Sequence, residues 1–248
     1  MKTIDLSIVI PTFNERKRLP KTYGSIVSYL KAKKVNGEII ISDDGSTDGT
    51  LDFANSLKGI PGQVETRVVS DPKRQGKGAG VKRGILASRG EWVLFMDADN
   101  STHLLEIEKF SPYKKDFDVI IGSRYAEVEQ EIKQNIIRQA ISRLGAFMVR
   151  SFTGLNYKDT QCGFKMFTKK SARDIFSTLE GTGWGFDVEV LFLAKKFGYR
   201  VKEVGVIWRD SEGSHLRPGF DSIKTFFEIW AISRRVKLSF HGLQSKNK

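Results

Sequence analysis

Short apolar runs alternate with segments of helical spacing along the first half of the chain, and this alternation constrains the fold more than any other feature. The apolar runs are β-branched and predict buried strands at Leu6–Ile10, Glu38–Ser42, Thr66–Ser70, Trp92–Asp97 and Val119–Gly122. The segments between them predict helices at Leu19–Lys33, Thr50–Leu57 and Ala79–Ser88. Strands and helices that alternate over short connections predict an α/β fold, a mostly parallel sheet with helices on both faces.

The second half of the chain has longer helical segments. Apolar spacing predicts helices at Asn135–Phe152 and Phe186–Lys196, a strand at Val201–Trp208 and a last helix at Phe220–Leu238. No flexible linker composition separates these segments, so we expect one domain over residues 1–218 and a C-terminal basic amphipathic helix and tail over 219–248. Every apolar run is far shorter than the roughly 18 residues of a membrane-spanning helix, so we expect none.

The charge of the chain predicts an anionic partner. Lys and Arg number 41 against 29 Asp and Glu, which gives a net charge of +12. Nucleic acid, a phosphorylated ligand and an anionic membrane surface all suit this excess. No helix-turn-helix, zinc finger or RNA-binding pattern is readable, so we expect no nucleic-acid partner. The lone Cys162 excludes an internal disulfide and is typical of a reducing compartment.

Acidic residues follow two of the predicted strands. Ligands of open α/β sheets bind beyond the carboxyl ends of the strands, where Asp43, Asp44, Asp97 and Asp99 stand. Asp97 and Asp99 lie two positions apart after a strand and would point to the same side, which suits a divalent cation such as Mg²⁺ or Mn²⁺ with a bound diphosphate. The alternative is a solvated turn. Asp43 and Asp44 similarly indicate either a turn or carboxylates that bind a nucleoside.

Basic residues at predicted loops and helices are candidate phosphate ligands. Lys77 and Gly78 lie in a glycine-rich segment that opens a helix, a setting that can hold phosphate. Arg124 follows a predicted strand and would pair with a phosphate or an acidic residue. Arg138 lies four residues before Ser142 on one predicted helix face. The alternative for these arginines is a solvated helix surface.

Taken together, these motifs resemble the inverting family-two glycosyltransferases with the GT-A fold. The resemblance rests on PTFNE, DDGSTDGT, DAD and GSRY, which occur in this order. The segments DTQCGFKMFTKK, WGFDVEVLF and WRDSEGSHLRP resemble the dolichyl-phosphate β-glucosyltransferases and, less closely, the dolichyl-phosphate mannose synthases. The resemblance covers the chain from Ile8 to about Pro218 and makes residues 1–218 a GT-A catalytic domain.

The resemblance implies a nucleotide-sugar donor, UDP-glucose or a relative, and a polyprenyl or dolichyl phosphate acceptor. It implies these donor-binding residues: Pro11, Phe13, Glu15, Asp43, Asp44, Lys77, Gly78, Asp97 and Ala98. Asp97 and Asp99 would bind Mg²⁺ or Mn²⁺. Acceptor-phosphate ligands would be Arg138, Ser142, Lys169 and Arg209. Catalytic residues would be Asp99, Asp159, Arg124 and Arg138. The alternative acceptor is a saccharide hydroxyl in cell-surface polysaccharide synthesis, which needs a carboxylate base such as Asp187 or Asp159.

The last predicted helix bears on where the protein acts. Ile223, Phe226, Phe227 and Trp230 form an apolar stripe flanked by Lys224, Arg234, Arg235 and Lys237. Basic amphipathic helices of this kind bind anionic bilayers. We therefore expect a cytoplasmic protein that is peripheral on the cytoplasmic face of a membrane. The alternative is a helix that packs on the core or in a homo-oligomer interface.

Overall fold

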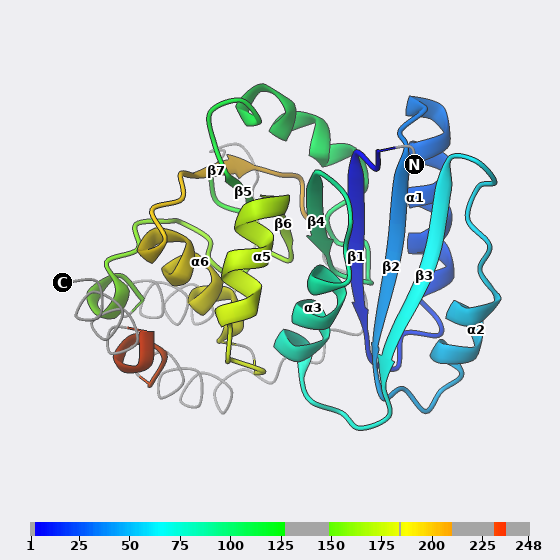
Figure 1. The fold of residues 1–248 in the computed structure, drawn as a ribbon, viewed down its shortest axis with the longest axis horizontal. Helices are drawn as coiled ribbons and strands as arrows, with labels where there is room; N and C mark the ends of the chain where they lie inside the picture. The colour runs from blue at the N-terminus through cyan, green and yellow to red at the C-terminus, as the bar shows by residue number, and fades with distance from the viewer. Residues whose placement is uncertain (1–2, 127–148, 184, 210–230, 237–248) are drawn as a thin grey trace.

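The computed structural model describes residues 3–126, 149–183, 185–209 and 231–236. Within them, one sheet of seven strands has the order β3-β2-β1-β4-β6-β5-β7 (Figure 1). Its strands are β1 (Leu6–Thr12), β2 (Gly37–Asp44), β3 (Val64–Asp71), β4 (Trp92–Met96), β5 (Val119–Ser123), β6 (Phe164–Thr168) and β7 (Val201–Gly205). Among these strands β6 alone runs antiparallel to its neighbours, β4 and β5.

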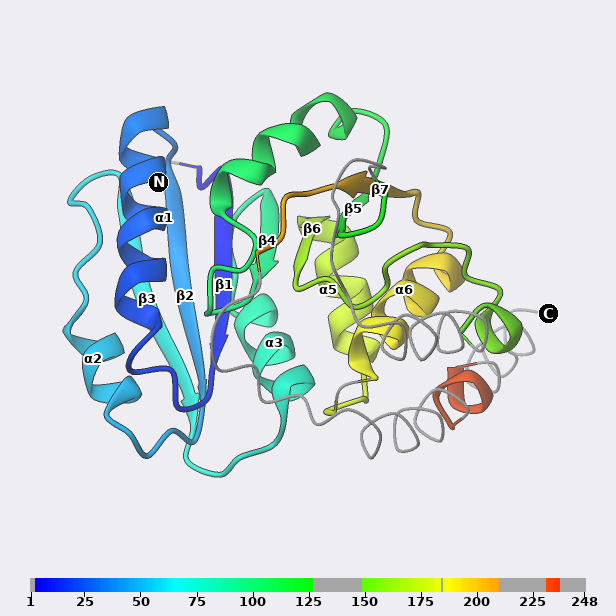
Figure 2. The ribbon, with the colours of Figure 1, turned by 180° about the vertical axis from the view of Figure 1, so that it is seen from behind.

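Helices cover both faces of the sheet (Figures 1 and 2). They are α1 (Leu19–Lys33), α2 (Thr50–Ser56), α3 (Lys77–Leu86), α5 (Lys169–Thr178), α6 (Phe186–Lys196) and the 3₁₀ helix η1 (Leu104–Tyr113). Alternate residues of the strands point into two separate cores. One core contains apolar residues of α1, α2 and η1, and the other contains those of α3, α5 and α6. The predicted α/β architecture with a mostly parallel sheet is confirmed.

Most predicted elements are confirmed, and three were missed. The five strands predicted in the first half are present, and α1 and α6 have the predicted bounds. The strand predicted at Val201–Trp208 ends earlier, at Gly205. The elements η1, α5 and β6 were not predicted from the sequence. In β6, Lys165 interrupts the apolar pattern, yet its side chain is buried and paired, as described below. The polar residue in the apolar pattern is the reason that the buried strand β6 was not predicted.

The predicted helices at 135–152 and 220–238 lie largely outside the described residues. The parts that the structure describes are helical, at 149–153 and at 231–236. In the last segment Ile232 and Val236 are buried in the same core as α5 and α6. The Ser233 hydroxyl donates a hydrogen bond to the Phe152 carbonyl over 2.7 Å. This part of the C-terminal segment therefore packs on the core, and the boundary at residue 218 stays a prediction. Among the described ranges, no helix has the length and apolar character for a bilayer crossing.

Close contact between α3 and β1 depends on a glycine. A Cβ placed on Gly84 would overlap the Val9 side chain and lie 3.2 Å from the Ser42 Cβ. Gly24 of α1 differs, because a Cβ there meets no atom within 4 Å and the residue is exposed. One glycine is thus required by packing, and the other only weakens its helix.

We expect Gly84→Ala and Gly24→Ala to change the free energy of unfolding in opposite directions. Overpacking at residue 84 costs about 1–3 kcal/mol. At residue 24, alanine restricts the unfolded chain and stabilises the helix by about 0.5–1 kcal/mol. Urea unfolding followed by circular dichroism measures both, and shifts of the same sign would contradict the packing described for α3.

Candidate active site

The carboxyl ends of the parallel strands meet at one edge of the sheet. Thr12 at the end of β1 is opposite Asp43 of β2, and Asp97 directly follows β4. Because β6 is antiparallel, it starts at this edge, where Phe164 is opposite Met96. The loops that precede β6 and follow β1, β2 and β4 therefore surround a common region, which we call the carboxyl edge.

The loops after β1 and β2 are joined into one unit by hydrogen bonds. The Asn14 amide donates to the Ser46 hydroxyl over 2.9 Å, and the Thr47 amide donates to Asn14 Oδ1 over 2.9 Å. The Glu15 amide donates to Thr50 Oγ1 over 2.8 Å. Asn14 adopts a left-handed backbone with φ of 57°, which asparagine tolerates better than most residues. PTFNE and DDGSTDGT thus fold together.

Asp43 and Asp44 are buried, and each carboxylate is used within the chain. Asp43 accepts hydrogen bonds from Thr12 Oγ1 at 3.0 Å and from the Ser46 hydroxyl at 2.5 Å. Asp44 accepts the backbone amides of the two residues before α3, including Gly76 at 2.7 Å. Both carboxylates therefore shape loops at the carboxyl edge, as the turn interpretation expects.

Asp97 is held between a lysine and a glycine. Its Oδ1 lies 2.7 Å from Lys77 Nζ in an ion pair, and its amide donates to the Gly163 carbonyl over 3.1 Å. A Cβ on Gly163 would overlap the Asp97 carboxylate. The glycine of the CGFK segment is therefore required by the close approach of this carboxylate, a role that the sequence analysis missed.

The loop after Asp97 carries the second carboxylate and an unusual asparagine. Asp99 Oδ1 accepts the Ser101 amide over 2.9 Å. Asn100 has a left-handed backbone with φ of 57°, and its Oδ1 is buried with no hydrogen-bond partner among the described residues. The Arg209 amide donates to the Ser101 carbonyl over 2.8 Å, so the segment after β7 lies beside this loop.

Glu15 belongs electrostatically to the same acidic group. Its carboxylate pairs with Arg18 through two hydrogen bonds of 2.6 Å. Burial nevertheless raises the pKa of Glu15, and the charges of Asp99 and Asp97 raise it further against the effect of Arg18. Glu15 therefore interacts electrostatically with both carboxylates that follow β4.

Arg124 and Asp159 form a partly buried ion pair at the end of β5. Arg124 Nε donates to Asp159 Oδ2 at 2.7 Å and Nη2 donates to Oδ1 at 2.9 Å, a two-pronged contact. Burial alone would raise the pKa of Asp159, but the hydrogen bonds and charge of Arg124 hold it below its usual value. The guanidinium also lies over the Trp208 ring, 5.6 Å from its centre. Asp159 is thus a partner of Arg124, and a poor proton acceptor.

A second buried ion pair lies behind Asp97. Lys165 Nζ contacts Asp187 Oδ1 at 2.5 Å and donates to the Cys162 carbonyl at 2.7 Å. Burial raises the pKa of Asp187, although Lys165 and then Lys77 act in the opposite direction. The sequence analysis missed Lys165, yet a lysine inside a run as apolar as FKMFT is a signal for a buried partner.

The remaining predicted residues divide between the carboxyl edge and other places. Pro11 is the residue before the last of β1, and Phe13 stacks under Arg74, whose guanidinium lies 4.0 Å from the ring centre. Ala98 and Gly78 are buried in the loop after β4 and the start of α3. Arg138 and Ser142 lie outside the described residues.

Lys169, which was predicted to be an acceptor-phosphate ligand, lies away from the carboxyl edge. Lys169 follows Thr168, which is opposite Trp92 at the start of β4, and its ammonium lies 3.6 Å from Glu91. The antiparallel direction of β6 carries Lys169 to the edge opposite the carboxyl edge. Nothing in the sequence pattern indicates this reversal of strand direction.

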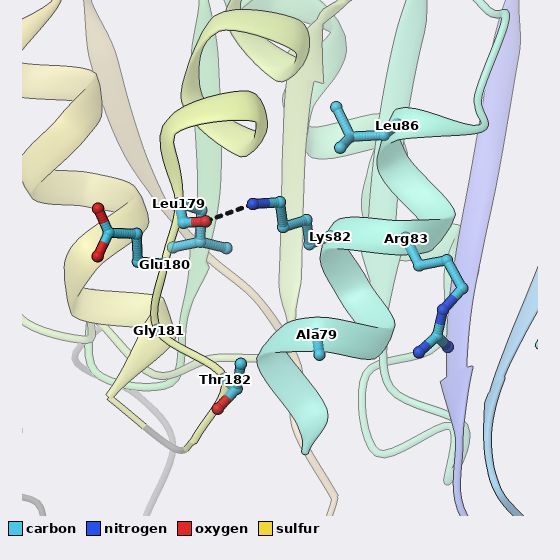
Figure 3. Close-up of a pocket in the computed structure, with 8 residues that line it drawn as sticks. All are labelled: Ala79, Lys82, Arg83, Leu86, Leu179, Glu180, Gly181 and Thr182. Atoms are coloured by element: carbon cyan, nitrogen blue, oxygen red, sulfur yellow. Dashed lines mark hydrogen bonds between the residues drawn. The ribbon is translucent and has the colours of Figure 1, made fainter. Parts of the chain in front are cut away.

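A hollow of about 390 Å³ separates α3 from the loop that joins α5 to α6 (Figure 3). Figure 3 shows Lys82 reaching across it to the Leu179 carbonyl, a hydrogen bond of 2.6 Å, with Thr182 beside the start of α3. The Thr182 carbonyl accepts the Gly78 amide at 2.9 Å. This loop therefore supports the backbone on which Lys77 stands.

The residues at the carboxyl edge fit a divalent cation that is shared with a diphosphate. No cluster of three or more acidic, histidine or cysteine side chains suited to a metal occurs within the described ranges. Mg²⁺ is commonly bound by one or two carboxylates together with substrate phosphates, so Asp97 and Asp99 suffice on the protein side. Asn100, whose buried oxygen has no hydrogen-bond partner among the described residues, directly follows Asp99 in the same loop.

Comparisons with known proteins identify relatives of the chain. Residues 7–176 match the model described as Glycosyl transferase family 2. The dolichyl-phosphate beta-glucosyltransferase of Dictyostelium discoideum is 35% identical over 98% of this chain and 78% of that protein. The enzymes of the same name from Homo sapiens and Saccharomyces cerevisiae are each 35% identical, over 87% and 96% of this chain and 71% and 77% of those proteins.

Solved structures share the fold at lower identity. Glucosyl-3-phosphoglycerate synthase from Mycobacterium tuberculosis, in complex with Mn²⁺, UDP and glucosyl-3-phosphoglycerate, has a TM-score of 0.65 and 20% identity over 96% of this chain and 80% of that one. Mannosyl-3-phosphoglycerate synthase from Rubrobacter xylanophilus has a TM-score of 0.66 and 19% identity over 95% and 75%. The expected GT-A fold is confirmed, and with the sequence matches at 35% identity the chain belongs to glycosyl transferase family 2.

Proposed function

We propose that the chain transfers a hexose, glucose in our assignment, from UDP-glucose or a related nucleotide sugar to a polyprenyl phosphate such as dolichyl phosphate, with inversion at the anomeric carbon. Relatives named dolichyl-phosphate beta-glucosyltransferase, at 35% identity over nearly the whole chain, support this assignment. The solved neighbour with Mn²⁺ and UDP bound shares the fold and supports a metal-dependent nucleotide-sugar reaction of the same kind.

The state of the two candidate bases is the observation that favours a phosphate acceptor over a saccharide hydroxyl. A hydroxyl acceptor needs a base to remove its proton. Asp159 is bound by Arg124, which lowers its pKa, and Asp187 is buried against Lys165. A phosphate monoester has a second pKa of about 6 and is already a nucleophilic anion near pH 7, so it needs no such base.

The same contacts suggest a role for each residue in the reaction. We assign Arg124, held by Asp159, to the acceptor or donor phosphate, with Arg138, Ser142 and Arg209 as further candidates for the acceptor phosphate. Pro11, Phe13 and Glu15 would line the nucleoside site, on loops that Asp43 and Asp44 shape. Asp97 and Asp99 would hold Mg²⁺ or Mn²⁺, which neutralises charge on the departing diphosphate when bound.

We further propose that the protein acts as a peripheral protein at the cytoplasmic face of a membrane. A polyprenyl phosphate resides in the bilayer, and the basic residues of the C-terminal segment suit an anionic surface. Arg235 is unsuited to this role, because its guanidinium contacts Glu180 at 3.2 Å and buried Glu189 at 2.5 Å. The other basic residues that the sequence analysis named on this segment are Lys224, Arg234 and Lys237.

The reaction product tests the proposed function. We expect incubation with radiolabelled UDP-glucose, dolichyl phosphate and Mn²⁺ to give a labelled product that extracts into organic solvent and releases glucose in mild acid. UDP-mannose and UDP-galactose serve as competing donors in parallel reactions. Label that stays in the aqueous phase on an added oligosaccharide would support the hydroxyl acceptor and contradict this proposal.

We expect Asp99→Ala to lower the rate of transfer by roughly 100- to 1,000-fold, since losing a metal carboxylate removes several kcal/mol of charge stabilisation at the leaving diphosphate. Gly163→Ala should cause a similar loss without removing a carboxylate, because its Cβ displaces Asp97. Steady-state rates measure both, with the thermal unfolding midpoint as the control for folding. Wild-type rates in Asp99→Ala would refute the metal assignment.

Membrane binding depends on charge if the C-terminal segment docks on lipid. We expect the double variant Lys224→Gln and Arg234→Gln to bind anionic phosphatidylserine vesicles roughly 30-fold more weakly, at about 1 kcal/mol for each basic residue near the surface. The matched control is Lys21→Gln with Lys31→Gln, exposed on α1, which removes the same charge elsewhere. Equal binding by both double variants in a sedimentation assay would argue against docking through this segment.

A further inference from the structure

Lys77 brings a positive charge directly onto one of the two carboxylates assigned to the metal. Its Nζ lies 2.7 Å from Asp97 Oδ1, and the two side chains are 22% and 33% exposed. A lysine is ordinarily charged near neutral pH, so at this distance the ammonium neutralises Asp97.

The backbone of Lys77 is fixed from both sides. Asp44 accepts the Gly76 amide at 2.7 Å, and the Thr182 carbonyl accepts the Gly78 amide at 2.9 Å. A Cβ on Gly78 would lie 2.5 Å from the Gly181 carbonyl oxygen, so the approach of this loop requires a glycine. With the backbone held, a change of partner by Lys77 has to come from rotation of its side chain alone.

A second buried charge pair lies beneath the Lys77–Asp97 pair. The ammonium groups of Lys77 and Lys165 lie 5.5 Å and 5.9 Å from the centre of the same Phe95 ring. Asp187, paired with Lys165, also acts electrostatically on Lys77. Two lysine–aspartate pairs therefore lie around the Phe95 ring, and the charges within each pair balance before any divalent cation binds.

We propose that Lys77 couples metal binding to nucleotide binding: its ammonium competes with the divalent cation for Asp97 until a diphosphate provides a partner for both. This inference rests on the proposed function, because it needs a nucleoside diphosphate at the carboxyl edge. A divalent cation at Asp97 and Asp99 adds two positive charges beside an existing one, which is unfavourable at short range. A diphosphate supplies the negative charge that removes this repulsion, so each ligand favours the other.

The test compares Mn²⁺ binding with and without UDP in the full chain. Electron paramagnetic resonance of free Mn²⁺ measures metal affinity alone, and calorimetry measures UDP affinity at saturating Mn²⁺. We expect Lys77→Met to bind Mn²⁺ alone roughly tenfold more tightly than the wild type, and to bind UDP roughly tenfold more weakly, within the usual range of coupling. Lys77→Arg, which keeps the charge, should restore both affinities toward wild-type values.

Lys82→Met is the matched control, because Lys82 lies on the same helix and its ammonium contacts the Leu179 carbonyl rather than a carboxylate. It should change neither affinity. If Lys77→Met binds Mn²⁺ in the absence of UDP no more tightly than the wild type does, the inference is overturned, whatever the affinity of the variant for UDP. Lys77→Gln replaces Lys77→Met if the latter does not fold by circular dichroism. A wild-type chain that binds no UDP would instead refute the proposed function itself.

Discussion

Carboxylates gathered at one edge of a sheet repel each other, and the architecture around this edge depends on offsetting that repulsion. Each acid has a different partner: Lys77 for Asp97, Arg124 for Asp159, Arg18 for Glu15, and backbone amides for Asp44. A buried ion is stable only when it is paired or hydrogen-bonded. The positive partners lie at the start of α3, directly after β5 and directly before α1, so elements on both faces of the sheet are needed to complete the edge.

The antiparallel strand β6 connects this electrostatic arrangement to the fold. Because β6 runs antiparallel to β4, its first residue lies at the carboxyl edge, and the preceding segment from Asp159 to Gly163 lies next to Asp97. In a parallel strand the last residue of β6 would lie at this edge instead. It also carries Lys165 into the core beside Asp187. The segment DTQCGFKMFT therefore contributes to the carboxyl edge through its direction in the sheet as well as through its residue types.

The excess of positive charge takes on a more specific meaning in the structure. Part of it neutralises acids inside the chain, as Lys165 and Arg235 do. These two pairs lie away from the carboxyl edge and do not attract an external anion. The attraction to a diphosphate or a lipid phosphate has to come from cations at the carboxyl edge, and Lys77 and Arg124 are the residues to which we assign it.

Periodicity and motif order in the sequence were enough to predict the α/β class, five strands, the bounds of α1 and α6, and the grouping of Asp43, Asp44, Asp97 and Asp99 at the carboxyl ends of strands. These features depend on local spacing and on the general geometry of parallel sheets, which a sequence carries directly. Strand direction, side-chain pairing and close backbone approach are decided by contacts between residues far apart in the chain. For that reason only the tertiary structure revealed that Asp159 is paired with Arg124, that Lys169 lies at the opposite edge, and that Gly163 must be a glycine because the Asp97 carboxylate occupies the space of a side chain.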